Sequence, residues 1–85
     1  MNEPEMKKII EEISELLIMK NKTYGDKNID KIGKSGIITR LEEKLERLKH
    51  MIENNIQDKE TVEDTWKDII GYAVIGIMLE RGRWN

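Results

Sequence analysis

A row of basic side chains at helical spacing lies in the middle of the chain. Arg40, Lys44 and Arg47 follow one another in steps of four and three residues, which places them on one face of a helix. An arginine fork matches two oxygens of a phosphate, and a lysine adds a point charge beside it. The row is therefore a candidate phosphate-binding surface. Ion pairs with Glu43 or with acids of another helix account for the same pattern.

A second basic group precedes this row, in the stretch "NKTYGDKNIDKIGKS" (21–35). Between Lys20 and Arg40 there are six basic and two acidic residues, although the chain as a whole has a net charge of −2. Lys27 and its neighbouring lysines are therefore expected to add to the phosphate-binding surface.

The motif "TYGD" within this stretch supplies the groups that are not basic. Gly25 permits a tight turn, and the ring of Tyr24 is a candidate for stacking or hydrogen bonding at the site. Asp26 has two interpretations, since it suits capping of the turn and also binding of a cation. We predict that the stretch takes part in ligand binding.

Acidic residues form a third pattern, at positions 64 and 68. Two aspartates one helical turn apart can share a divalent cation through hard oxygen ligands, so Asp64 and Asp68 are candidate Mg²⁺ ligands. Asp68 begins a row that continues as apolar residues, so partial burial and a positive partner are expected. The alternative to a metal is an ion pair between Asp68 and Arg47 or Arg40.

Two further acids are candidate Mg²⁺ ligands in the segment "EEISEL" (11–16). Glu12 and Glu15 are three residues apart, a spacing that occurs in magnesium sites. Glutamates at the same spacing are also common on solvent-exposed helix faces, so the interpretation that Glu12 and Glu15 are ordinary surface residues stays open.

Apolar periodicity predicts three helices that position these groups, over about 4–20, 36–54 and 59–81. A chain of 85 residues has room for one core, so we expect a single all-α domain spanning 1–85. The stretch 21–35 is predicted to be a long ordered loop. The second helix is expected to pack through a seam of Ile38, Leu41, Leu45, Leu48 and Ile52.

The third helix has apolar residues on two faces. One face carries Val62, Trp66, Ile69, Ile70, Ala73 and Ile77, and the other carries Asp64, Asp68, Gly71, Tyr72, Ile75 and Leu79. A three-helix domain of this size cannot cover both, so we expect a homo-oligomer, a dimer or larger, packed as a helical bundle. Trp66 is also a candidate ring for stacking on a base.

Composition excludes several classes. The chain contains no cysteine, so thiolate metal sites and disulfides are excluded. Its longest apolar run, 69–79, is shorter than the roughly 20 residues of a membrane span. The charged start "MNEPEMKK" lacks the apolar core of a signal peptide, so we expect a cytoplasmic protein. The net charge of −2 argues against bulk binding of nucleic acid.

The order of three motifs resembles that of a known family. "NKTYGD", then "GIITRLEEKLERL", then "ETVEDTWKDIIGYAVI" looks like the phage-associated nucleotide modification associated domain family, type 1, over about residues 20–76. The resemblance implies an all-α fold and a link to nucleotides, in the host cytoplasm if the chain is viral. By position it implies the site residues Tyr24, Gly25, Asp26, Arg40, Lys44, Arg47, Asp64, Thr65, Asp68 and Tyr72.

The chain is also distantly similar to the all-α nucleoside triphosphate pyrophosphatases of the MazG type. These enzymes set a Glu-x-x-Glu helix against a Glu-x-x-Asp helix around magnesium. "EEISEL" matches the first motif loosely, whereas Asp64 and Asp68 are four residues apart and Thr65 stands where the second glutamate is expected.

Three hypotheses remain from the sequence. The first is a small phage-type nucleotide-binding protein, in one variant an anti-defence protein that sequesters a host cyclic-nucleotide signal. The second is a magnesium-dependent nucleotide pyrophosphohydrolase that uses Glu12, Glu15, Asp64 and Asp68. The third is a structural helical adaptor whose charged rows form only ion pairs.

Overall fold

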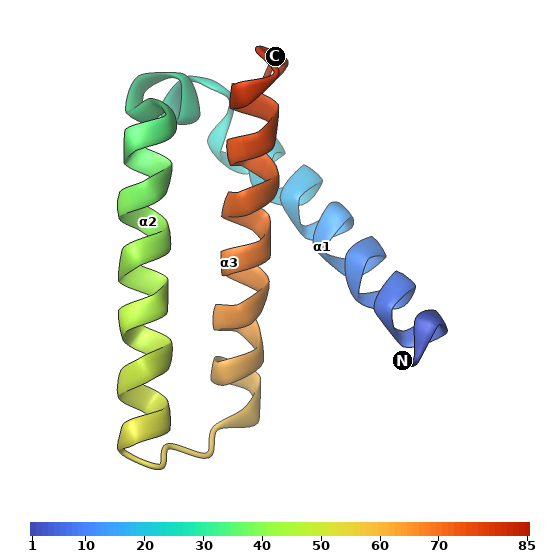
Figure 1. Cartoon of the computed structure of the whole chain (residues 1–85). Coiled ribbons are helices and arrows are strands. Elements are labelled where there is room, and N and C mark those ends of the chain that lie inside the picture. The colour runs from blue at the N-terminus through green and yellow to red at the C-terminus, as the bar shows by residue number, and fades with distance from the viewer.

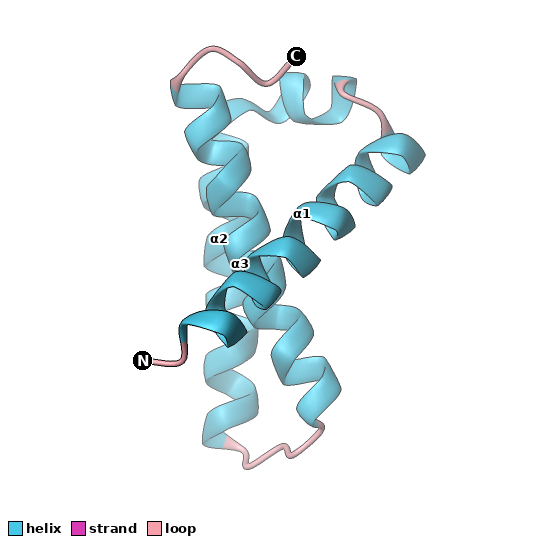
Figure 2. Cartoon of the chain, turned by 90° about the vertical axis from the view of Figure 1, so that its right-hand side faces the viewer, coloured by secondary structure: helices cyan, strands magenta, loops and turns pink.

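Three helices and no strands make up the computed structural model, which describes all residues from Met1 to Asn85. They are α1 (Glu3–Tyr24), α2 (Lys27–Glu53) and α3 (Lys59–Glu80). Figure 1 shows α2 and α3 as an antiparallel hairpin, with α1 running diagonally away from it. The view turned by 90° shows α1 crossing in front of the hairpin (Figure 2). The predicted all-α, three-helix fold is confirmed.

Side-chain caps fix where two of the helices begin. The Asn2 side chain accepts a hydrogen bond from the Glu5 N–H at 3.1 Å, and Pro4 occupies the first turn of α1. At α3, the Asp58 carboxylate accepts from the Thr61 N–H at 3.3 Å and from the Thr61 hydroxyl at 2.7 Å. The bonds from the Glu5 and Thr61 N–H groups satisfy donors that the first helical turn leaves without a backbone partner, and the Thr61 hydroxyl adds a side-chain contact.

The predicted long loop over 21–35 is wrong. Helix α1 continues to Tyr24, and only Gly25 and Asp26 separate it from α2. Both changes of direction fall at glycines with left-handed backbone, Gly25 (φ 76°) and Gly33 (φ 61°). The residues between the two glycines are helical. This segment contains no proline that would break a helix, and its Ile29 and Ile32 lie in the apolar lining of the groove described below. Gly33 then offsets the first turn of α2 from the rest of that helix.

The predicted seam of α2 is rotated in the structure. The residues of α2 that are buried are Ile37, Leu48 and Met51, whereas Ile38, Leu45 and Ile52 are more than half exposed. Leu41 and Leu48 belong to the predicted seam and to the observed one, which also contains Lys44. The helix therefore packs on α3 through a row one residue earlier than expected.

Helix α1 packs closely against α3 at Gly71, which has no side chain. A Cβ atom built on Gly71 would lie 3.2 Å from Cδ2 of Leu17, which is tighter than ordinary contact. The missing Cβ of Gly71 thus makes room for the side chain of Leu17. The contact between α1 and α3 is less extensive than that between α2 and α3.

A last feature concerns membranes. None of the three helices combines the length and the apolar character that a membrane crossing requires.

Candidate functional site

A groove of about 1180 Å³ lies between α1 and the α2–α3 hairpin. It is lined mainly by the second half of α1, by the first turns and the middle of α2, and by one face of α3. Its floor is apolar and includes Ile13, Leu17, Ile32 and Ile75. The volume slightly exceeds the range of about 300–1000 Å³ that is usual for small-molecule sites.

Positive side chains dominate the polar part of the groove. Five cationic side chains and two carboxylates line it, so its formal charge is positive although the chain carries −2. Such a balance favours an anionic ligand, because like charges that are close together in a partly desolvated groove gain from an added negative charge. The charged lining residues are Lys20, Lys22, Arg40, Lys44, Lys67, Glu43 and Asp68.

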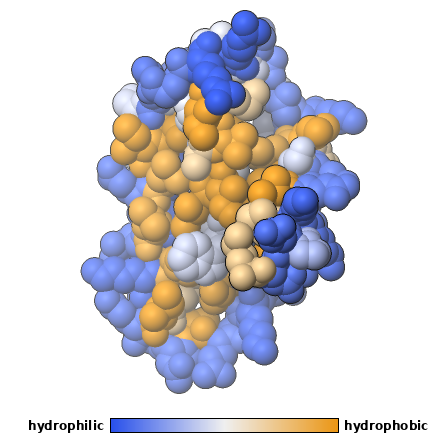
Figure 3. Space-filling model, turned by 45° about the vertical axis from the view of Figure 1, so that its right-hand side comes forward, coloured by the Kyte–Doolittle hydropathy of each residue, from blue (hydrophilic) through white to orange (hydrophobic).

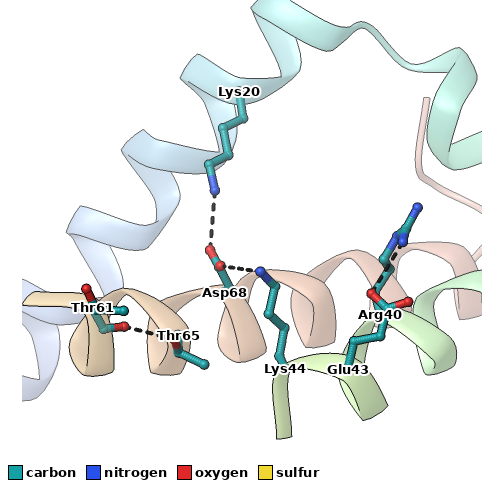
Figure 4. Close-up of polar contacts among 7 residues, drawn as sticks. All are labelled: Lys20, Arg40, Glu43, Lys44, Thr61, Thr65 and Asp68. Carbon is teal, nitrogen blue, oxygen red and sulfur yellow. Dashed lines mark hydrogen bonds and ion pairs between the residues drawn. The ribbon is translucent and has the colours of Figure 1, made fainter. Parts of the chain in front are cut away.

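Asp68 lies at the centre of this charged group. Its Oδ2 is 3.1 Å from Nζ of Lys44 in α2, and its Oδ1 is 3.3 Å from Nζ of Lys20 in α1 (Figure 4). The side chain is 22% exposed, so the expected partial burial is confirmed. The positive partner is also found, but it consists of two lysines instead of Arg47 or Arg40. One carboxylate thus holds two ammonium groups from two different helices.

The basic row of α2 is divided by the structure. Lys44 and Arg40 both line the groove, whereas Arg47 is exposed and lies outside the lining. Nη1 of Arg40 is 3.4 Å from Oε2 of Glu43 on the same helix, which is the intrahelical pair that the sequence also suggested. This pair is exposed and therefore weak, so it leaves the guanidinium available to a competing anion.

Lys67 of α3 ties a second point of α1 to the hairpin. Its Nζ lies 3.2 Å from Oε2 of Glu63 and 3.5 Å from Oε2 of Glu12. The hydrogen bond with Glu63, followed by the charges of Glu63 and Glu12, raises the pKa of Lys67 above its ordinary value. Glu12 is thus engaged with a lysine.

The aromatic and turn residues are also divided. Tyr24, Gly25 and Tyr72 line the groove, as expected for a joint site. Asp26 and Lys27 lie beside it without forming part of its lining. Trp66 is half exposed and does not line the groove, so the structure separates it from Tyr24, Gly25 and Tyr72.

Trp84 lines the groove without being part of the predicted site. Its indole Nε1 donates a hydrogen bond of 3.1 Å to the backbone carbonyl of Asp26. The segment that follows α3 is thereby fixed against the turn between α1 and α2. No periodic pattern surrounds Trp84, so the sequence gives no signal for this contact.

The four predicted Mg²⁺ ligands do not form one cluster. Asp68 is paired with lysines, Glu12 contacts Lys67, and both Glu15 and Asp64 are exposed. No three acidic or histidine side chains are grouped so that they could hold a metal ion. A magnesium-dependent reaction stays a prediction from the spacing of these acids and from the resemblance.

Two lysines of the groove, Lys20 and Lys67, lie outside the predicted site, and a third, Lys22, is one of the loop lysines that were expected to add to it. Lys20 and Lys22 belong to the last turns of α1, in a stretch that the sequence assigned to the end of a helix and to a loop. Lys67 stands directly before Asp68 in α3. The basic segment beginning at Lys20 was the available signal for Lys20 and Lys22, and nothing in the spacing singled out Lys67.

Comparison of the chain with protein-family models, with curated proteins and with solved structures finds no match.

Proposed function

We propose that the protein binds a nucleotide in the groove between α1 and the hairpin. The observation that carries this proposal is the excess of cationic side chains lining a concave, largely apolar surface on an acidic chain. Lys20, Lys44 and Arg40 hold the phosphates: Lys20 and Lys44 converge on Asp68 from two helices, and Arg40 lines the same groove one helical turn before Lys44. Charge-assisted contacts of this kind are the strong ones in phosphate recognition.

The base of the nucleotide is assigned to the aromatic side of the groove. Tyr24 is 73% exposed at the end of α1, so its ring is free to cover a bound base. Tyr72 reaches the groove from α3. Stacking on an aromatic ring tolerates any base, so this contact supplies affinity and leaves the identity of the base to other groups.

Binding without turnover is the simplest activity for such a site. The phosphate-holding groups are lysines and an arginine, and no step of the proposal needs a catalytic acid. The phage-type, anti-defence role follows from the resemblance: a small protein that sequesters a nucleotide signal needs tight binding and nothing further. We further propose that the functional unit is a homo-oligomer in the cytoplasm.

Calorimetry on the purified chain at low ionic strength tests the proposal. Nucleoside mono-, di- and triphosphates and cyclic nucleotides are titrated, and at least one class is expected to bind. Lys44→Ala should weaken that binding about tenfold, or about 1.4 kcal/mol. Arg47→Ala is the matched control, because it removes one positive charge from the same helix outside the groove.

The outcomes separate site binding from general attraction. If no nucleotide binds to the wild-type chain, the proposal is wrong. If Lys44→Ala and Arg47→Ala weaken binding equally, the groove is not the site.

A further inference from the structure

A second surface of the molecule is apolar and exposed. We call it the outer face, and it consists of two rows, one from α2 and one from α3. Ile38, Leu45 and Ile52 are 55%, 52% and 65% exposed, and Trp66 and Ile77 are 50% and 52% exposed. Ala73 completes the row of α3. Figure 3 shows hydrophobic surface extending over much of the height of the molecule on this side, with hydrophilic residues at its edges.

The two rows lie on the same side of the hairpin. A smaller hollow of about 360 Å³ is lined by Ile38 of α2 together with Ala73 and Ile77 of α3, so the rows meet across it. Only Tyr72 lines both this hollow and the groove. The outer face and the groove are therefore separate surfaces of one hairpin, and occupation of one leaves the other accessible.

The total surface area indicates how much of the chain lacks a partner. The chain exposes 6735 Å², and its mass is 10.0 kDa. A folded monomer of that mass is expected to expose about 5200 Å². The radius of gyration is 14.0 Å, compared with about 12 Å for a compact domain of the same length. The excess of about 1500 Å² is more than the roughly 800 Å² that each partner buries in a standard interface.

The spacing of the rows indicates what kind of partner fits. Ile38, Leu45 and Ile52 recur every seven residues, and the row of α3 advances by seven residues from Trp66 to Ala73 and by four from Ala73 to Ile77. Both are the spacings of a seam that packs against another helix. A partner that matches two such rows at once presents two adjacent helices, as a second α2–α3 hairpin does.

We propose that the outer face pairs with the outer face of a second copy of this chain. The two hairpins then form a four-helix bundle whose core contains Ile38, Leu45, Ile52, Trp66, Ala73 and Ile77 from each copy. Bundles of this kind bury one apolar stripe per helix, which is what each helix of the hairpin still exposes. The proposal deepens the homo-oligomer part of the proposed function and rests on it. Both grooves lie away from the interface, so a dimer carries two independent sites.

Light scattering coupled to gel filtration tests the pairing without any ligand. The wild-type chain is expected at twice its 10.0 kDa mass, and Leu45→Glu and Ile77→Glu are each expected at the mass of one chain. Met19→Glu is the matched control. Met19 is an apolar residue with a similar exposed fraction of 59%, but it lies on α1, so this variant should remain a dimer.

A second measurement does not depend on disruptive substitutions. In Trp84→Phe, Trp66 is the one remaining tryptophan, and its emission should shift to shorter wavelength as the protein concentration rises and the dimer forms. A wild-type chain that stays at 10.0 kDa with an unchanged Trp66 spectrum overturns the proposal. So does a dimer that Met19→Glu dissociates and Leu45→Glu does not. Failure of nucleotide binding with a normal dimer would instead affect only the proposed function.

Discussion

Lys44 and Asp68 form an ion pair of 3.1 Å across the interface between α2 and α3, and both side chains are only 22% exposed. The lysine occupies the packing row of α2, where an unpaired ammonium would be costly. The carboxylate offsets this cost and also holds Lys20 from α1. The same three groups thus connect all three helices and supply two of the charges proposed to bind phosphate.

Removal of the Asp68 charge should strengthen anion binding. In Asp68→Asn, Lys20 and Lys44 no longer have a carboxylate that competes with phosphate, so we expect nucleotide affinity to rise about tenfold at low salt, or about 1.4 kcal/mol. Stability should fall by about 1 to 2 kcal/mol, because two ion pairs are lost and each contributes up to about 1 kcal/mol. Calorimetry and urea unfolding measure the two effects. Weaker nucleotide binding in Asp68→Asn would show that the carboxylate belongs to the binding site itself.

The indole of Trp84 should influence the groove through the turn that it holds. Trp84→Phe keeps an aromatic ring at this position but lacks the indole N–H, so the hydrogen bond to the Asp26 carbonyl is lost. The turn that carries Tyr24 and Gly25 is then less fixed, and we expect nucleotide affinity to fall about threefold, or about 0.7 kcal/mol. Asn85→Ala is the control, since it removes the neighbouring contact to Asp30 and leaves the indole in place. Equal losses in both variants would argue against a specific role of the indole.

The Asp58 cap of α3 should make the stability of the fold decrease at low pH. The hydrogen bonds from the side chain and the backbone N–H of Thr61 lower the pKa of Asp58 below its ordinary value of 3.8. A lowered pKa in the folded state gives stability that is complete above the ordinary value and is lost as the pH falls through the folded value. Asp58→Asn keeps a good cap without the charge, so its melting temperature should match the wild type near pH 7 and decline less between pH 4 and pH 2. Parallel pH profiles for the two proteins would contradict this.

The close approach at Gly71 can be tested with a double-mutant cycle. Alanine at position 71 gains about 1 kcal/mol of helix propensity, but its methyl group lies 3.2 Å from Leu17. We expect Gly71→Ala to stabilise the chain by about 1 kcal/mol in a Leu17→Ala background and by clearly less in the wild type. Urea unfolding of the four proteins gives the coupling. Identical effects in both backgrounds would mean that Leu17 moves aside without cost.

Periodicity was sufficient to predict the three helices, since each contains several turns of regularly spaced apolar residues. It was insufficient for the connector. The first helical turn of α2 holds only Ile29 and Ile32, and two residues do not establish a period. The bends at Gly25 and Gly33 depend on positive φ angles, which a glycine permits without requiring.

The packing row of α2 shows a second limit. Rows through Ile37 and through Ile38 share Leu41 and Leu48, and only the row through Ile37 contains a lysine. Apolar content alone therefore favours the wrong row. The correct one depends on Asp68, which lies on another helix 24 positions after Lys44, and such a pairing is decided by tertiary contacts. Asp68 itself was identifiable, because an isolated carboxylate on a row that becomes apolar needs a partner.

The limited attachment of α1 has a consequence for how the chain opens. Helix α1 meets the hairpin mainly where Leu17 contacts Gly71 and where Lys20 and Glu12 find their partners. The hairpin has its own packing row, so α1 can detach while α2 and α3 remain folded. We therefore expect amide protons of α1 to exchange with solvent through a local opening of lower free energy than global unfolding. One wall of the groove then belongs to a less stable folding unit than the other.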